Sequence, residues 1–216
     1  MVSAGEKQAF MDYTNVSRET FTRFSAYETL LKKWNPVINL VSTSTLSHVW
    51  TRHFLDSAQI WALRPENTRR WLDLGSGGGF PGMIIAILAA DHTPNLSVTL
   101  VESDARKAAF LASVKQKLGI SVEICIERAE VLAPHGADVV SARALAPLST
   151  LLGYSALHTA TDGVGLFPKG KNHEIELTKA RKYWTFTEKQ TPSRTDPDGV
   201  ILTIRGPARV ADTKNR

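Results

Sequence analysis

The chain has very little cysteine and no long apolar segment. Its one cysteine, Cys125, cannot form an internal disulfide or a thiolate metal cluster. The longest apolar run, residues 83–90, is far shorter than the roughly 20 residues of a membrane-spanning helix, and the first thirty residues lack the basic-then-apolar pattern of a secretory leader. The six histidines are scattered, without an acidic or cysteine cluster beside them. We therefore expect a soluble, cytoplasmic monomer with no membrane or metal, in which Cys125 is a small buried side chain.

Internal repeats and low-complexity tracts are also absent. With 43% hydrophobic and 22% charged residues among 216, the chain can fold as one globule around a sizeable core. Its net charge of +5 is uneven, because residues 1–168 balance and residues 169–216 hold the whole basic excess. Clustered cations neutralise phosphates and release counterions, so this quarter favours a nucleic-acid partner. A solvated helix face is the alternative, since Lys179, Arg181 and Lys182 fall on an expected helix.

Apolar spacing divides the chain into two parts. Residues 1–66 read as a helical extension, with helices over 19–34 and 45–63, a cap at Ser17 and a stop at Pro65. From residue 67 onward strands and helices alternate, with strands at 71–74, 97–102, 122–126, 138–142 and 163–167 and helices at 81–90, 105–118, 148–160 and 173–184. Two final strands, 184–190 and 200–205, enclose a polar loop at 190–199. Residues 67–216 are therefore expected to form an α/β fold: a mostly parallel sheet with helices on both faces and an antiparallel pair at one edge.

A glycine-rich loop follows the first of these strands. Residues 73–82 read DLGSGGGFPG, with five glycines in the eight positions from Gly75 to Gly82. Open parallel sheets bind ligands beyond the carboxyl ends of their strands. Glycines let a backbone turn sharply and approach a ligand with no Cβ in the way. The loop therefore predicts a cofactor site.

Two cofactors fit this loop. Gly77, Gly79 and Gly82 match the spacing of a dinucleotide fingerprint, and Glu102 follows 20 positions later, so a nicotinamide-dependent oxidoreductase is possible. Asp73, directly on the strand end, favours a cationic cofactor such as S-adenosylmethionine, which has no pyrophosphate to seat on a helix N-terminus. With either cofactor, Glu102 would accept hydrogen bonds from the ribose hydroxyls.

Further polar residues follow the later strands. The backbone of residues 127–130 could contact an adenine edge, and Arg143 is placed to contact cofactor or substrate. In the extension, Arg52 and Asp56 lie one helical turn apart, where they could form a weak ion pair or, with His53, hold the helix over a cleft. No Ser-His-Asp arrangement is visible.

At these residues the chain resembles a known family, the bacterial small-subunit rRNA guanine-N7 methyltransferases, RsmG or GidB. The resemblance covers nearly the whole chain and is carried by residues 33–40 (KWNPVINL), 52–57 (RHFLDS), 73–82, 110–111 (FL), 128–130 (RAE), 141–144 (SARA) and 167–170 (FPKG). It implies a class I, Rossmann-like, S-adenosylmethionine-dependent methyltransferase with an N-terminal helical extension. Its target would be a guanosine in the decoding-region loop of 16S rRNA. The cofactor contacts it implies fall on Gly75, Phe80, Ala129, Glu130 and Arg143, whereas Pro36 stands where the family more often has a polar residue.

The expected chemistry needs no catalytic acid or base. Guanine N7 carries an unprotonated lone pair, so the enzyme would only align the reacting atoms and exclude water. The basic residues expected to position the RNA are Arg143, Lys169, Lys171 and Arg128. The substrate would be 16S rRNA, the small subunit or an assembly intermediate, and a non-catalytic RNA-binding module is the alternative. Trp34, Asn35 and Asn39 could simply end a helix and satisfy a turn, and the sequence leaves open a further role for Lys33, Asn35 and Asn39.

Overall fold

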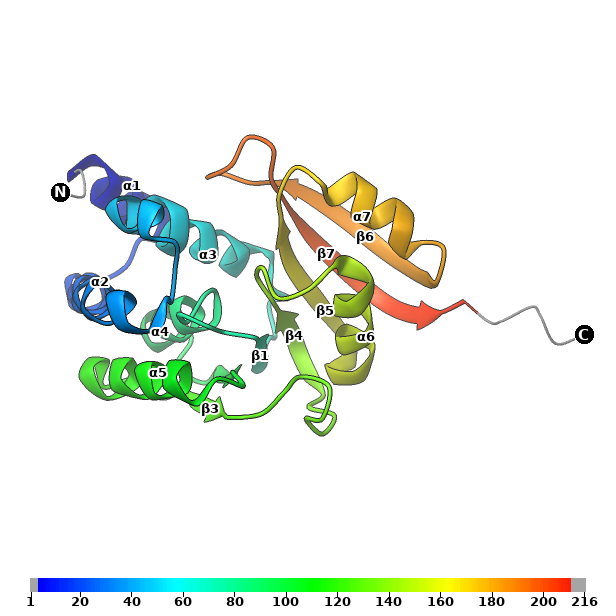
Figure 1. Cartoon of the computed structure of the whole chain (residues 1–216), viewed down its shortest axis with the longest axis horizontal. Coiled ribbons are helices and arrows are strands. Elements are labelled where there is room, and N and C mark those ends of the chain that lie inside the picture. Colours follow the sequence, from blue (N-terminus) through cyan, green and yellow to red (C-terminus); the bar gives the residue numbers. More distant parts are fainter. Residues whose placement is uncertain (1–3, 211–216) are drawn as a thin grey trace, which may run out of the picture.

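The computed structural model describes residues 4–210, and its centre is a seven-stranded sheet in the order β3-β2-β1-β4-β5-β7-β6 (Figure 1). The strands are β1 (Arg70–Leu74), β2 (Ser97–Val101), β3 (Glu123–Cys125), β4 (Ala137–Ser141), β5 (Thr159–Lys169), β6 (Trp184–Pro192) and β7 (Val200–Arg209). β1 to β5 are parallel, while β7 runs antiparallel to both β5 and β6. The predicted parallel sheet with an antiparallel edge pair is confirmed.

Helices cover both faces of this sheet. One face carries α4 (Gly82–His92) and α5 (Ala105–Leu118), and the other carries α6 (Leu148–His158) and α7 (His173–Ala180) (Figure 1). α5 begins at its Asp104 cap and ends at Gly119, whose φ of +60° suits glycine. α7 stops short of its expected end because the chain turns into β6. No helix of residues 4–210 is long and apolar enough to cross a membrane.

The extension differs more from expectation. α1 (Ala4–Thr14), which the sequence did not indicate, precedes α2 (Arg18–Ile38). The single helix expected over 45–63 is instead a run of η1 (Thr43–His48), η2 (Trp50–Leu55), α3 (Asp56–Ala58) and η3 (Gln59–Leu63). η1 and η3 are 3-10 helices and η2 is a π-helix.

Local side chains explain the ends of α2. Ser17 caps its start, as predicted, by accepting a hydrogen bond from the Thr20 amide. Asn39 ends the helix with a φ of +47°, and the Asn35 side chain accepts a hydrogen bond from the Val41 amide. The expected role of Asn35 and Asn39 at a helix end is therefore confirmed. Lys33 is exposed, and Pro36 lies in the last turn.

The extension shares the core of one sheet face. Phe10, Phe24, Trp50 and Phe54 are fully buried and meet edge-on or tilted, in a cluster continuous with α4 and α5. Cys125 corrects an expectation, because it is only half-buried on β3, a strand at the edge of the sheet. Phe54 of this aromatic cluster also packs against Phe80, so the extension contacts the glycine-rich loop.

Candidate cofactor and substrate site

The glycine-rich loop joins β1 to α4 at the carboxyl edge of the sheet. Gly75, Gly77 and Gly79 have φ values of +64°, +56° and +89°, which other residues rarely adopt. A Cβ on Gly77 would meet no atom within 3.8 Å outside its neighbours, so the space beside it is open. A Cβ on Gly79 would instead overlap the Tyr27 hydroxyl. Gly77 thus faces a space that a ligand can enter, whereas Gly79 makes room for the extension.

Tyr27, on α2 of the extension, contacts this loop through its hydroxyl group and its ring. Its buried hydroxyl donates a hydrogen bond to the Gly78 carbonyl, and its ring stacks on Phe80 at 5.7 Å between centroids. Burial raises the pKa of Tyr27 well above its usual value, a shift that Arg143 lowers and Asp73 increases. The hydroxyl therefore remains protonated and able to donate.

Glu102 ties the loop to the next strand. One carboxylate oxygen accepts a hydrogen bond from the Gly77 amide at 2.8 Å, and the other accepts one from the Asp104 amide at 2.8 Å. The structure thus brings together Gly77 and Glu102, two residues expected at the cofactor site. Each oxygen retains a second lone pair, so the carboxylate can still accept hydrogen bonds from a ribose.

Asp73 is placed differently from the direct cofactor contact expected. It is fully buried, accepting hydrogen bonds from the Gly82 amide at 3.1 Å and the Ser141 hydroxyl at 2.6 Å. Burial raises its pKa to about 6 by disfavouring the charged form, and this outweighs the hydrogen bonds that lower the pKa. Asp73 therefore fixes the far end of the loop against β4.

The segment after β3 carries Ala129 and Glu130, whose contact with the cofactor stays a prediction. Ala129 is buried, and its carbonyl accepts a hydrogen bond from His158 at 3.1 Å. Arg128 and Glu130 are exposed and lie 3.8 Å apart as an ion pair. The hydrogen bond that fixes Ala129 thus comes from α6, on the side of the sheet opposite the extension.

Arg143, after β4, is held by the extension. Its guanidinium donates to Asp56 at 2.9 Å, to the Arg52 carbonyl at 3.2 Å and to His53 Nδ1 at 3.1 Å. A guanidinium can only donate, so His53 Nδ1 accepts and the ring proton lies on Nε2, which reaches the Thr45 hydroxyl at 2.7 Å. Burial, followed by the charges of Arg143 and Arg52, lowers the pKa of His53 to about 3. His53 is therefore neutral at physiological pH.

This arrangement corrects the predicted pairing within the extension. Asp56 pairs with Arg143, while Arg52 is exposed and donates to the Thr195 carbonyl at 3.4 Å. Asp56 also accepts a hydrogen bond from the Thr195 hydroxyl at 2.6 Å. The polar loop between β6 and β7 bends back over the extension, so both side chains find partners far away in the sequence. The alternative role, holding the extension at a cleft, fits this geometry.

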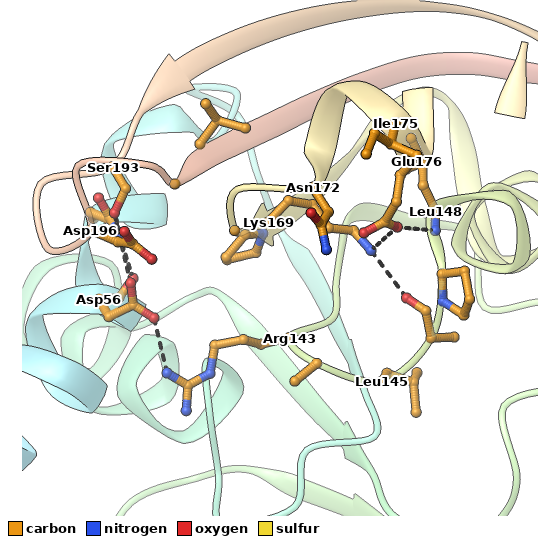
Figure 2. A pocket seen from close by; sticks show the side chains of 18 of the residues that line it. Asp56, Arg143, Leu145, Leu148, Lys169, Asn172, Ile175, Glu176, Ser193 and Asp196 are labelled. Carbon is orange, nitrogen blue, oxygen red and sulfur yellow. Dashed lines mark hydrogen bonds and ion pairs between the residues drawn. The ribbon is translucent and has the colours of Figure 1, made fainter. Parts of the chain in front are cut away.

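A cleft of about 1020 Å³ opens beside Arg143. It is lined by parts of residues 45–59, 143–149, 168–179 and 193–200, which meet at the carboxyl ends of β4 and β5. Figure 2 shows Asp56 and Arg143 on one side, with Lys169 and Glu176 across from them. Ala144, with a φ of +54°, turns the chain so that Leu145 lines the cleft and lies against Gly75. The glycine-rich loop and the cleft therefore meet at Leu145.

Some of the basic residues in the last quarter of the chain form ion pairs within the protein, and others are exposed without such a pair among residues 4–210. Lys169 turns inward, is 9% exposed in its side chain and donates to Glu176 at 2.8 Å and the Ala146 carbonyl at 3.1 Å. α7 brings Glu176 back over the strand end, so Lys169 is engaged within the protein, and its contact with RNA stays a prediction. Lys171 and Lys182 are exposed, while Arg181 pairs with Glu188. Two further cations of the basic quarter, at positions 214 and 216, lie outside the described residues.

Comparison with known proteins decides the family. The family model described as "GidB: rRNA small subunit methyltransferase G" matches residues 20–199. The chain belongs to the rRNA small subunit methyltransferase G family. It is 53% identical over 189 residues to the Ribosomal RNA small subunit methyltransferase G of Rhodospirillum centenum, covering 88% of this chain and 85% of that protein. Identity to the protein of the same name from a Ruegeria species is 48% over 196 residues, covering 91% and 95%.

Solved structures show the same fold. A TehB-like SAM-dependent methyltransferase from Corynebacterium glutamicum aligns with a TM-score of 0.53 at 13% identity, over 84% of this chain and 98% of that one. TYW2 of M. jannaschii, in complex with AdoMet, aligns with a TM-score of 0.51 at 11% identity, over 71% and 73%. The family match confirms the expected rRNA methyltransferase, and the fold is the one expected for a methyltransferase that depends on S-adenosylmethionine. They disfavour the nicotinamide-dependent alternative.

The sequence did not reveal two groups that shape this methyltransferase's site. Tyr27 lies 51 residues from Gly78, and its spacing in α2 indicated only a core position. Thr195 lies 139 residues from Asp56, in a loop whose composition indicated only a solvent-exposed turn. Neither contact has a local signal, because each depends on how the extension packs on the sheet.

Proposed function

We propose that this rRNA methyltransferase transfers a methyl group from S-adenosylmethionine to N7 of a guanosine in the decoding-region loop of 16S rRNA. The observation that carries the proposal is that Leu145 both lines the cleft beside Arg143 and packs against Gly75, so that the cleft borders the glycine-rich loop. A methyl donor on one side and a base on the other would come together there. The methylation would take place in the cytoplasm, on rRNA of the small subunit.

The residues of the loop suit the cofactor. When bound, S-adenosylmethionine supplies an electrophilic methyl group on a sulfonium ion. Gly77 leaves room for a ligand against the backbone, and Glu102 has lone pairs free for two ribose hydroxyls. By resemblance to the family, Gly75, Phe80, Ala129, Glu130 and Arg143 would complete the cofactor site.

The cleft suits a nucleophile that needs no deprotonation. His53 is neutral and engaged at both ring nitrogens, and Asp56 is paired with Arg143. Neither group is free to act as a general base. Guanine N7 needs none, so the contribution of the protein is to align N7 with the methyl group and to exclude water.

Access to N7 requires an unpaired base. In A-form RNA, N7 faces a major groove too deep and narrow for side chains, so the target must be in a loop or splayed out. A cleft of about 1020 Å³ is large enough for a nucleoside. Arg143 would then lie beside the guanine edge, whose N7 and O6 are acceptors.

The test uses RNA that lacks the modification. Naked 16S rRNA and small subunits from a strain without this gene are incubated with protein and tritiated S-adenosylmethionine, and the product is cleaved chemically at 7-methylguanosine. We expect one methyl group per RNA, at a guanosine of the decoding-region loop, in at least one substrate. Methylation at another atom or region would contradict the proposal. Calorimetry with S-adenosylmethionine and with NAD separates the alternatives. A methyltransferase binds S-adenosylmethionine, a nicotinamide-dependent oxidoreductase binds NAD, and a module that binds only RNA binds neither.

A further inference from the structure

An apolar surface open to solvent lies in the cleft. It consists of Leu145, Pro147 and Ile175, and we name it the apolar shelf. Ile175, on α7, is 56% exposed and Leu145 is 38% exposed. Large apolar side chains that gather in a cleft while facing water mark a binding surface rather than a core.

The shelf is held in place by an ion pair that has no role in the proposed methyl transfer. One oxygen of Glu176 accepts hydrogen bonds from Lys169 at 2.8 Å and from the Leu148 amide at 2.7 Å. The same lysine donates to the Ala146 carbonyl at 3.1 Å. These bonds join α7 to the loop that carries Leu145 and Pro147 (Figure 2). The protein's own hydrogen bonds therefore hold α7, which carries Ile175, against the loop that carries Leu145 and Pro147.

Free positive charge borders the shelf. Lys179 lies one helical turn after Ile175 and lines the same cleft, and Lys171 precedes the helix. Both are exposed. Unlike Lys169 and Arg143, neither has an ion-pair partner within residues 4–210. An apolar surface beside an unpaired cation matches the two parts of a nucleotide, a base and a phosphate.

We propose that the apolar shelf and Lys179 bind a nucleotide adjacent to the target guanosine in the RNA chain, an inference that rests on the proposed function. Splaying out the target base leaves its neighbour without a stacking partner. The shelf replaces that partner, with the base lying on Ile175 and Pro147 and its phosphate meeting Lys179. The occupant is RNA rather than a protein segment because the charge one helical turn from Ile175 is positive, whereas Asp196, which also lines the cleft without an ion pair among residues 4–210, lies across the cleft beside Asp56 (Figure 2). The cleft also continues to the place proposed for the target base.

The test compares two variants with two controls. Ile175→Ala and Lys179→Met remove the apolar contact and the charge of the shelf. Tyr183→Ala and Lys182→Met make similar changes at exposed positions that do not line the cleft. Fluorescence anisotropy measures the binding of single-stranded RNA with the decoding-loop sequence. Parallel RNAs carry an abasic residue on the 5′ or the 3′ side of the target guanosine.

We expect Ile175→Ala to raise the RNA dissociation constant by roughly fivefold to tenfold, and neither control to do so. One abasic RNA should lose the same affinity with the wild type and show no further loss with Ile175→Ala, as expected for two groups in contact. Lys179→Met should lower the slope of log affinity against log salt by about 0.7.

Two results would contradict the proposal that the apolar shelf binds a nucleotide. The first is an equal affinity of Ile175→Ala and the wild type for the RNA. The second is a loss of affinity with Ile175→Ala that adds to the loss seen with each of the two abasic RNAs. Because these readouts measure binding, they remain decisive if methylation maps to another atom, which would contradict the proposed function alone.

Discussion

A single hydroxyl group joins the extension to the glycine-rich loop. Tyr27, on α2, donates a hydrogen bond to the Gly78 carbonyl, and its ring stacks against both Phe54 and Phe80. The substitution Tyr27→Phe removes the donor and retains the stacked ring. It therefore separates the hydrogen bond from the packing that surrounds it.

The size of the effect follows from burial. The Gly78 carbonyl would lose a buried partner, which costs about 1–3 kcal/mol. For a chain of this length each 1 kcal/mol lowers the melting temperature by about 2–4 °C. If S-adenosylmethionine binds only when the Gly78 segment has its wild-type conformation, binding must supply this lost free energy. Each 1.4 kcal/mol of it raises the dissociation constant for S-adenosylmethionine about tenfold. We expect a fall of a few degrees in Tm and about a tenfold loss of S-adenosylmethionine affinity.

Calorimetry of cofactor binding and thermal unfolding measure the two effects separately. The matched control is Tyr13→Phe, whose hydroxyl lies 3.5 Å from the Gln59 carbonyl in another part of the extension. It should leave the affinity for S-adenosylmethionine unchanged. If Tyr27→Phe lowers Tm while binding the cofactor as tightly as the wild type, the hydroxyl supports the fold and has no effect on the loop.

Three other substitutions test the site by the same measurements. Gly77→Val should abolish cofactor binding, because the positive φ of Gly77 strains a branched residue and the new side chain would occupy the open space proposed for the cofactor; normal affinity in a folded variant would contradict this. Glu102→Gln should weaken S-adenosylmethionine at least tenfold by removing charge-assisted bonds worth about 1.5–3 kcal/mol each, and a loss below about threefold would place Glu102 outside the site. Asp56→Asn should lower Tm by several degrees, since it leaves Arg143 without its carboxylate; an unchanged Tm would show that the pair contributes nothing to stability.

The sequence was most informative where structure depends on neighbouring residues. The ends of α5 follow from Asp104 and Gly119, and the start of α2 follows from Ser17. Alternating strands and helices predict that the glycine-rich loop and Glu102 lie at one edge of the sheet, where the structure joins them by a hydrogen bond. Such signals lie within a few residues of the feature they specify.

The sequence was least informative where partners are distant. The π-helical turn η2 carries Arg52 and His53, and the partner of both, Arg143, lies about 90 residues away. Lys169 appeared as a free cation because Glu176 reaches it only after α7 folds back. Residues 43–63 follow an irregular path that tertiary contacts impose, so periodicity alone predicted one regular helix there.

The buried carboxyl of Asp73 also gives stability a defined dependence on pH. Its pKa is about 6 in the folded protein, because burial disfavours the charged form, against an ordinary value of 3.8. Between about pH 4 and pH 6 the folded state therefore keeps a proton that the unfolded state has released. Stability from this group is present below about pH 4 and is lost as pH rises through about 6. A shift of about two units corresponds to roughly 3 kcal/mol.

Comparison with Asp73→Asn isolates this effect from all other titrating groups. Urea unfolding of both proteins from pH 4 to pH 7 should show the wild type losing roughly 3 kcal/mol relative to the variant, with the change complete near pH 7. Asp104→Asn is the control of opposite sign, because hydrogen bonds from Arg106 lower the pKa of Asp104 and its contribution disappears only as pH falls. A difference between wild type and Asp73→Asn that stays constant across this range would show that Asp73 is charged at pH 4, and that the protein compensates its burial fully.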